Sequence, residues 1–504
     1  MSIRITGMNS GLDTDAMVQE LVSAYDKKTE TYRGSQKKLQ WKQDAWQELN
    51  TKVKNFVSKS LNNMRFSANY QKKTTTVSNT SVASVVSSDN AVNGRQSLKV
   101  SSLAQSAYLT GGKVTARDAD NNPTTDKVTS ETTLSALGYK TSGTITLTKG
   151  TGTEPIEISV DGDMTIARFV DTVAAAGLNA SFDEANGRIF VSAQESGSAN
   201  NFSFGGDTAA LSALGLAGVD GEGNNAKMIE GSDATIWLNK VQYTSGSNSF
   251  SINGLTINVT AETGDEEVTL STETDYSAIY DSIKSFLKEY NSLINQMDSL
   301  YNAKSADDYD MLTNEEKDEM TDDEVKEWED KIKSALLRRD ENLNTVSSTL
   351  RNAMLQTYEV DGKTYSLASF GIETLSYFLA ADNEKNAYHI NGDPDDPDTS
   401  GETDKLKAAI ASNPDAVSGF FRQLAENMNT QMNKISTSSV YRSFGNFYDD
   451  KKLQKEYDEW TTKISDYESY VADVEERYYK QFTAMEKAMG EMQSQQSYIQ
   501  QLMG

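Results

Sequence analysis

The chain has 504 residues, of which 37% are hydrophobic and 24% are charged, so several packed domains are expected rather than one. Its formal net charge of −26 argues against binding of the whole chain to nucleic acid through phosphate neutralisation. The sequence has no cysteine, one histidine (His389) and no P-loop, which nearly excludes thiol catalysis and a Ser-His-Asp triad. We therefore expect no enzymatic activity, no cofactor and no metal.

No stretch is long and apolar enough to span a bilayer, and the N-terminus shows no secretory signal peptide. We expect no membrane insertion, and export would need a route that keeps the N-terminus. A chain without cysteine does not depend on oxidative folding and can cross a narrow channel unfolded. Residues 1–75 hold 13 Lys and Arg against 7 Asp and Glu. This basic start is either an arm that binds lipid or nucleic acid, or a solvated helix face. The second is favoured because the basic residues are interspersed with apolar helix positions.

The first predicted element is a helix that starts within "MNSGLDTDAMVQELVSAYDKK", residues 8–28. Asp13 and Thr14 are residue types that cap helix N-termini. An apolar stripe at helical spacing follows, formed by Met17, Val18, Leu21, Val22 and Tyr25. Helical character extends over residues 12–66, with Gly34 as the expected joint between two pieces.

A β-rich region begins near Thr74 and continues to about residue 272, with strand-length runs bounded by Gly, Asn or Asp. One short helix is predicted within it, at residues 164–177. Asn- and Gly-rich stretches at 116–127 and 217–226 suggest boundaries. We predict an inner β-rich domain of residues 76–110 and 230–273, with an outer β-rich domain of residues 111–229 inserted into it.

Helical periodicity returns after Asp275, in residues 275–301 and 321–354, and a small mixed segment follows at 358–421. With residues 38–66 and 415–464, these runs are expected to form one helical domain, residues 38–75 and 274–464. Its predicted buried side chains are Trp46, Phe286, Leu293, Trp328, Leu336 and Leu343.

The last fifty residues carry the strongest periodic signal. Apolar residues from Leu453 to Tyr478 recur alternately every four and three positions, slip by one at Phe482, and resume to Leu502. A sustained period of 3.5 residues is typical of a coiled coil. The N-terminal stripe is its nearest candidate partner, so both chain ends are predicted to form an antiparallel coiled-coil domain, residues 1–37 and 465–504.

The predicted fold class is therefore α+β and multidomain. Both chain ends form a discontinuous helical bundle and terminal coiled-coil helices, and two β-rich domains are inserted between them. In a single free chain, the two terminal helices are expected to be frayed, because neither apolar stripe has enough partners to be stable alone.

Three further features favour structural interpretations. The acidic loop at 391–404 lacks the central Gly and closing Glu of a calcium loop, and Pro397 replaces a ligand, so a solvated turn is expected. The acidic run at 313–330 is expected to be a solvated helix face, and His389 a surface residue. Trp237, in an alternating strand, is expected in the core, and the alternative is an aromatic platform for glycans.

The two chain ends resemble the flagellar filament cap proteins, also called type 2 hook-associated proteins. The "SGLDT" start at residues 10–14 and the C-terminal "FTAMEKAMGEMQSQQSYIQQLMG" at 482–504 are the specific matches. "VNGRQSLKVSSLAQSA" at 92–107 is similar to a strand that leads into the family's β region, and "LTNEEKDEMTDDEVKEWEDKIKSALLRRD" at 312–340 also resembles a family segment. The run at 164–193 is similar to an insert shared by flagellins and hook-associated proteins.

The resemblance implies a secreted, extracellular structural protein at the distal tip of the bacterial flagellar filament. It implies a closed ring of copies, with a pentamer expected, that promotes flagellin folding and polymerisation and prevents monomer leakage. Implied partners are flagellin, the hook-filament junction proteins, and the export apparatus with its chaperone. Self-assembly and filament contact are assigned to Leu12, Val18, Leu21, Tyr25, Tyr478, Phe482, Met485, Met489, Met492, Ile499 and Leu502.

Two alternatives stay open. The chain could be another axial protein, at the hook-filament junction or flagellin-like, because these share paired terminal helices. It could also be an adhesin that binds mucus or host glycans through its β-rich domains, or a β-domain enzyme acting on glycans.

Overall fold

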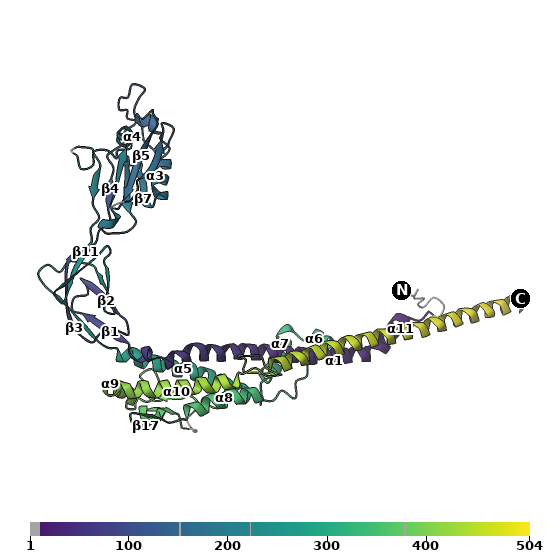
Figure 1. The fold of residues 1–504 in the computed structure, drawn as a ribbon. Coiled ribbons are helices and arrows are strands. Elements are labelled where there is room, and N and C mark those ends of the chain that lie inside the picture. The colour runs from purple at the N-terminus through teal and green to yellow at the C-terminus, as the bar shows by residue number, and fades with distance from the viewer. Residues whose placement is uncertain (1–10, 151–152, 222, 377, 379, 504) are drawn as a thin grey trace. The chain divides into compact units, whose positions relative to one another are not determined.

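The computed structural model describes residues 11–150, 153–221, 223–376, 378 and 380–503. The chain divides into two compact units, a helical unit of Met1–Tyr70 and Tyr276–Gly504 and a β unit of Gln71–Asp275 (Figure 1). Both chain ends contribute helices to the first unit, and the second is built from several sheets. The predicted α+β class, with a helical bundle from both ends and β-rich insertions, is confirmed.

Helix α1 (Thr14–Asn55) opens the helical unit. The side chain of Asp13 caps it by accepting a hydrogen bond from the Ala16 amide at 3.0 Å, as the sequence predicts. The helix runs through Gly34 without interruption, so the predicted joint is wrong. Glycine is required there by packing: a Cβ on Gly34 would lie 2.9 Å from the Cβ of Met311. After α1 come a π-helical turn (Phe56–Leu61), α2 (Asn62–Arg65) and a 3₁₀ turn (Ser67–Tyr70).

The rest of the helical unit follows the β unit in sequence. Its helices are α5 (Tyr276–Tyr301), α6 (Asn314–Asp318), α7 (Asp322–Ser334), α8 (Glu341–Met354), α9 (Lys405–Ser412), α10 (Pro414–Ile435) and α11 (Asp450–Met503). Two small hairpins are formed by β16 (Tyr358–Val360) with β17 (Lys363–Tyr365), and β18 (Ile372–Thr374) with β19 (Tyr388–Ile390). One hydrophobic core joins α1, α5, α8, α9 and α10. It contains four side chains that the sequence predicts as buried, namely Trp46, Phe286, Leu293 and Leu343.

Two predicted core residues are not in this core. The run 321–354 is not one helix, because α7 ends at Ser334 and α8 starts after its N-cap, Asp340. The turn between them moves the buried position by one residue, so Leu337 is fully buried and Leu336 is half-buried. Trp328 is also half-buried, and its indole Nε1 donates to the carbonyl of Asp310 at 2.8 Å. The predictions for Leu336 and Trp328 are therefore wrong.

The segment that contains α6 and α7, residues 306–330, packs along α1 and is here named the acidic hairpin. It holds 13 Asp and Glu against two Lys. The Asn314 amide donates to the Glu30 carboxylate at 2.7 Å, and Met311 packs on Gly34. Just beyond the hairpin, the Lys333 ammonium lies 4.5 Å from the centre of the Trp41 ring. Most of the hairpin's acidic side chains are exposed, in agreement with the predicted solvated helix face.

Three carboxylates of the acidic hairpin have lowered pKa values. Backbone and hydroxyl hydrogen bonds from Thr313 and Thr321 lower the pKa of Glu316 and Glu324, in two capping boxes. Burial acts to raise the pKa of Glu329, but hydrogen bonds from Lys317 and Lys333 outweigh it and leave that pKa lowered. All three groups favour the charged form more in the folded chain than in the unfolded chain.

Acid is therefore expected to loosen the acidic hairpin. A lowered folded pKa gives stability that is present above the unfolded value of 4.5 and is lost as the pH falls through the folded value. We expect the protection of backbone amides against hydrogen exchange, corrected for intrinsic exchange rates, to decrease from pH 6 to pH 3. The decrease should be larger in α6 and α7 than in α5. In Glu329→Gln this pH dependence should be smaller. Equal protection at both pH values would contradict the expectation.

The β unit contains two cores. The first lies between two antiparallel sheets, β1-β15-β3-β11-β12 and β13-β14-β2. Its strands are β1 (Lys73–Val77), β2 (Ala83–Ser87), β3 (Gly94–Ser102), β11 (Ala234–Leu238), β12 (Val241–Ser245), β13 (Ser249–Ile252), β14 (Leu255–Val259) and β15 (Val268–Thr274). Trp237 of β11 is 39% exposed, whereas its neighbours Ile236 and Leu238 are buried. The predicted core position of Trp237 is wrong because the strand turns the opposite set of alternating residues inward.

The second core is built from sheets β10-β4-β8-β7 and β6-β5-β9 with two helices. Its elements are β4 (Tyr108–Thr110), β5 (Gly143–Lys149), β6 (Ile156–Val160), α3 (Ile166–Ala175), β7 (Leu178–Asp183), β8 (Arg188–Ala193), β9 (Phe202–Gly206), α4 (Thr208–Ala213) and β10 (Lys227–Ile229). Helix α3 confirms the helix predicted within residues 164–177. Strand β4 pairs with β8 and β10, so the sheet of the second core begins before the boundary predicted at residue 111.

A fragment of residues 71–275 is expected to fold alone as a soluble, β-rich monomer. Strand β1 pairs with β15 from Lys73↔Thr274 to Val77↔Leu270, so the predicted start at residue 76 falls inside a strand. A fragment of residues 76–273 loses three of these five residue pairs and should have a lower midpoint of thermal unfolding. Circular dichroism and sedimentation of both fragments test this. Aggregation of the longer fragment, or equal midpoints, would contradict the assigned boundary.

Candidate functional site

The two ends of the chain meet along α1 and α11, which run side by side in opposite directions (Figure 1). Contacts pair rising residue numbers on α1 with falling numbers on α11. Tyr25 lies 6.0 Å from Tyr470 and Tyr32 lies 5.4 Å from Tyr467, measured between ring centroids. Further along, Trp46 stacks on Tyr448 at 5.2 Å. The predicted antiparallel association of the chain ends is therefore present in a single copy.

A small hydrophobic cluster lies near the start of α1. Val18 and Val22 of α1 and Val471 of α11 are its buried members. Tyr25, Tyr467, Tyr478, Tyr479 and Phe482 pack around them and are partly buried. This cluster is separate from the core of the helical unit. With so few buried side chains, the pair has little packing of its own at this end, and association with further chains would add to it.

The middle of the helix pair is aromatic and charged. The Lys463 ammonium lies 4.3 Å from the centre of the Tyr32 ring and 4.5 Å from that of Trp460. The Arg33 guanidinium donates to Glu468 at 2.6 Å, and both side chains are largely exposed, so this ion pair adds little stability. The amide of Gln36 donates to the Thr461 hydroxyl at 2.7 Å. Polar and aromatic contacts therefore fix the register of α1 against α11.

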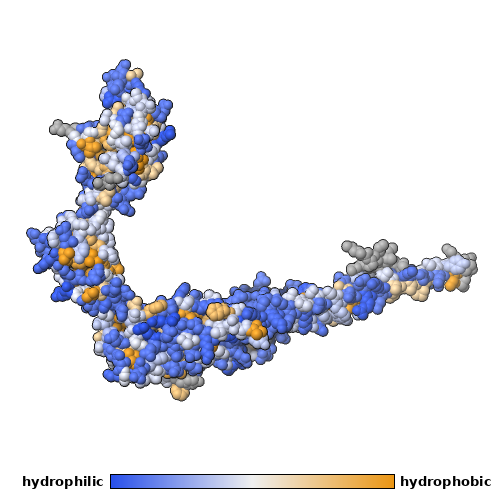
Figure 2. Space-filling view, in the orientation of Figure 1, coloured by the Kyte–Doolittle hydropathy of each residue, from blue (hydrophilic) through white to orange (hydrophobic). Residues whose placement is uncertain are grey.

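The C-terminal part of α11 extends past the first residue of α1. Phe482 still belongs to the cluster around Val18, near the start of α1. The side chains from residue 491 to residue 500 are all exposed, including Met492 at 62% and Ile499 at 55%. In Figure 2, pale and orange atoms occur among blue ones along this end of the helix. Its apolar stripe is thus available to other molecules.

The predicted assembly residues fall into distinct environments. Val18 is buried; Tyr25, Tyr478, Phe482, Met485 and Met489 are half-buried; and Leu12, Leu21, Met492 and Ile499 are exposed. The side chain of Leu502 lies outside the described residues. The sequence placed Trp460 on the apolar repeat of the C-terminal helix but not among the site residues, and it left out Tyr32 and Tyr470, although the three form the aromatic middle of the site. The high number of Tyr and Trp residues in both helices is the sequence feature that could have indicated these positions.

The predicted surface position of His389 is wrong. Its side chain is 15% exposed, and Nδ1 lies 2.6 Å from the Asp396 carboxylate because the loop after β19 folds back over the ring. That loop is not simply a solvated turn either. Asp393 is buried and binds the Lys284 ammonium at 2.6 Å, with Asp395 at 2.7 Å. These two carboxylates share the Lys284 ammonium.

Two kinds of site are absent from the described part of the chain. Among those residues, no group of three or more His, Cys, Asp or Glu is placed to hold a metal ion. In the same residues, no helix combines the length and the apolar character that a membrane span requires. The helix pair, with its small buried cluster and exposed apolar stripe, is the candidate site, as a surface for association.

The chain is similar to curated proteins over nearly its whole length. A curated relative, flagellar hook-associated protein 2 of Halalkalibacterium halodurans, is 24% identical over 555 residues, covering 99% of each chain. The protein of the same name from Escherichia coli K12 is 24% identical over 525 residues, covering 99% of this chain and 98% of its own.

A solved structure shows the same fold. The D1-D2-D3 domains of the flagellar cap protein FliD from Escherichia coli align with a TM-score of 0.52 at 21% identity, covering 82% of this chain and 99% of that chain. Family models described as the N-terminus and the C-terminus of flagellar hook-associated protein 2 match residues 10–107, and residues 231–399 with 400–494. Since the C-terminal model alone covers more than half of the 504 residues, the chain belongs to the flagellar hook-associated protein 2 family.

Proposed function

We propose that this chain is a structural capping protein at the distal tip of the bacterial flagellar filament. Family membership and the shared fold support the cap assignment. The observation that carries it is the α1–α11 pair, whose apolar stripe continues on α11 past the start of α1. A stripe of this kind fits a leg that engages neighbouring chains at a growing end.

The cap promotes flagellin folding and polymerisation and prevents leakage of monomers. Copies form a closed ring, most simply a pentamer, that contacts flagellin and, at the start of assembly, the hook-filament junction proteins. The chain is secreted through the flagellar export apparatus with its chaperone. The absence of cysteine supports export of an unfolded chain.

Each part of the chain takes one role in this proposal. Residues 1–37 and 465–504 form the leg, and residues 38–70 and 276–464 the helical body. The β unit, residues 71–275, forms the plate. The leg residues from Leu12 to Tyr25 and from Tyr478 to Leu502 contact neighbouring copies and flagellin. The adhesin alternative rests on the exposure of Trp237 alone and is not proposed.

Native mass measurement and electron microscopy of the purified full chain test the proposal. We expect closed rings whose mass is a small multiple of 55.4 kDa, five copies in the proposed form. The same protein, added to cells that lack it, should label the distal tips of filaments. Long filaments of the chain itself, or label spread along the filament, would contradict the cap assignment.

A further inference from the structure

The loop between α10 and α11, residues 436–449, exposes three large apolar side chains. Val440 is 85% exposed, Tyr441 is 58% exposed and Phe444 is 83% exposed. We call these three residues the apolar loop tip. Solvent-exposed apolar side chains grouped so closely are typical of binding surfaces.

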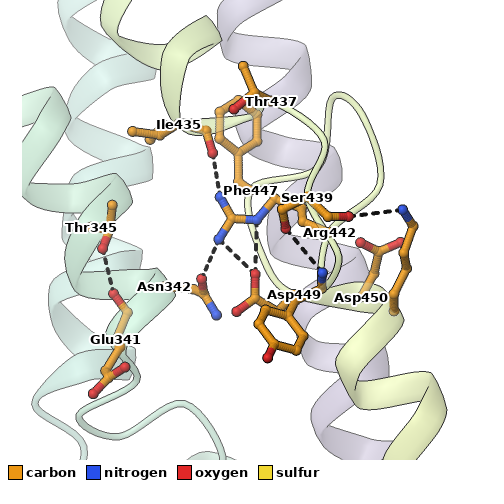
Figure 3. A network of polar contacts seen from close by, with 12 residues as sticks. Glu341, Asn342, Thr345, Ile435, Thr437, Ser439, Arg442, Phe447, Asp449 and Asp450 are labelled. Carbon is orange, nitrogen blue, oxygen red and sulfur yellow. Dashed lines mark hydrogen bonds and ion pairs between the residues drawn. The ribbon is translucent and has the colours of Figure 1, made fainter.

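The loop is held in one conformation by Arg442 (Figure 3). Its guanidinium donates to the Ile435 carbonyl, to Asn342 at 2.6 Å and to the Asp449 carboxylate at 2.9 Å. The Ser443 amide next to it donates to Asp450 at 2.7 Å. These bonds connect the end of α10, the start of α8 and the start of α11, so the loop tip is fixed by three helices.

A second set of contacts fixes the loop to α1. The Phe447 amide donates to the Asn50 side chain at 2.9 Å, and the Tyr448 ring stacks on Trp46. Phe447 and Tyr448 are buried, whereas the loop tip is not. Because the loop is already ordered, a partner that binds the tip has a small entropic cost to meet.

The charge around the loop is opposite to that of the chain. Residues 434–455 hold five Lys and Arg against two Asp, while the whole chain has a net charge of −26. Lys434, Lys451, Lys452 and Lys455 are all exposed there. One complementary surface in this molecule is the acidic hairpin, with 13 acidic and two basic residues. Opposite charges on two surfaces favour their association and oppose pairing of either surface with itself.

The two surfaces lie on nearly opposite sides of α1. Residues of α1 that contact the loop (Trp46, Asn50) and residues that contact the hairpin (Glu30, Gly34) are separated by about 160° around the helix. Two different surfaces on opposite sides of one molecule produce head-to-tail contacts, which close into rings when the rotation allows.

We propose that the apolar loop tip of one copy docks on the acidic hairpin of a second copy of this chain, an inference that rests on the ring proposed above. Tyr441 and Phe444 pack against the half-buried Met320 and Val325 of the hairpin, and the surrounding lysines face its carboxylates. The hairpin contacts α1 at Gly34, and the loop contacts α1 at Asn50, about 24 Å further along the helix. In a flat ring the loop of one copy and the hairpin of the next lie at the same height, so α1 is inclined to the ring axis.

Variants of the full-length chain test this contact. For each variant, sedimentation experiments measure the protein concentration at which oligomers form. Val440→Ser with Phe444→Ser should raise that concentration about tenfold or more, as removal of central interface residues does. Leu355→Ser, which removes a 69% exposed side chain elsewhere in the helical unit, is the matched control and should leave it unchanged. Lys451→Glu with Lys452→Glu should also weaken assembly, and Asp322→Lys with Asp323→Lys in the same chain should restore it.

The cysteine-free sequence allows a direct test of proximity. A Phe444→Cys, Asp322→Cys variant treated with a short bifunctional thiol crosslinker should give a ladder of joined copies, and Leu355→Cys, Asp322→Cys should not. Rings of wild-type mass from the Val440→Ser, Phe444→Ser variant, with no crosslinked ladder, would overturn the docking surface and leave the cap function intact. A wild-type chain that stays monomeric at every concentration would overturn both.

Discussion

Replacing Trp46 with alanine is expected to lower the free energy of unfolding of the helical unit by about 3–5 kcal/mol. The side chain is 1% exposed and stacks on Tyr448 with an interplanar angle of 6°. Its Nε1 also lies 3.5 Å from the Asp340 carboxylate, the N-cap of α8. The substitution therefore leaves a cavity where α1, α8 and the start of α11 meet. Chemical denaturation of the full chain, monitored by far-ultraviolet circular dichroism at the helical transition, measures the change.

Trp237→Ala is the matched control. It removes the same kind of side chain from the β unit, where it is 39% exposed, and should change the β transition by much less. The β transition should be unaffected by Trp46→Ala, because residues 71–275 form their own compact unit. A loss below about 1 kcal/mol in Trp46→Ala would show that this junction is not part of the cooperative core.

Met489→Glu is expected to abolish capping while leaving both compact units folded. Met489 is half-buried on α11, beyond the buried cluster around Val18. A charge there enters the apolar stripe that the cap proposal assigns to neighbouring chains, and burial of an unpaired charge is costly. Cells that produce this variant should export it, lose motility and release unpolymerised flagellin into the medium. An immunoblot of the medium and electron microscopy of the filaments measure this result.

Ser494→Glu adds the same charge on a different side of α11. At 100° per residue it lies about 140° from Met489 and about 160° from Met492, so it points away from the stripe. Filament growth should be close to normal in this variant. Normal filaments with Met489→Glu would contradict the leg assignment, and loss of capping in both variants would show that charge alone, not the stripe, is responsible.

Sequence patterns predicted the large elements because their periodicities extend over many residues. The 3.5-residue repeat of α11 and the stripe from Met17 to Tyr25 predicted an antiparallel pair, and the contacts of Tyr25 with Tyr470 show one. The alternating runs between residues 74 and 272 predicted the β strands. In most proteins the spacing of hydrophobic residues is the main signal for such helices and strands, so these elements could be predicted without knowledge of the tertiary contacts.

The errors concern features that depend on a single tertiary contact. Glycine in a helix costs about 1 kcal/mol, which made Gly34 a reasonable joint, but packing of Met311 on its bare backbone overrides that preference. A short turn before α8 places Leu337 rather than Leu336 in the core. The spacing of hydrophobic residues does not reveal such a turn. An alternating strand does not reveal which of its two faces is buried, so Trp237 was placed on the wrong one.

The aromatic middle of the site was missed for a related reason. Tyr32 belongs to no apolar stripe of α1, and its environment comes from Trp460, Tyr467 and Lys463 of α11. The exposure of the apolar loop tip could not be predicted from the sequence either, because the presence of Val, Tyr and Phe in a loop does not reveal whether their side chains are buried.

Helix α1 belongs to both the leg and the body of the helical unit without a break. Its 42 residues span about 63 Å, from the cluster around Val18 to the core around Trp46 and Val53. It therefore acts as a lever: a tilt of about 5° at the core displaces Thr14 by about 5 Å over that length. If the leg contacts the growing filament as proposed, forces on the leg reach the core through α1, and the stiffness of this one helix limits how far each subunit can follow the filament end.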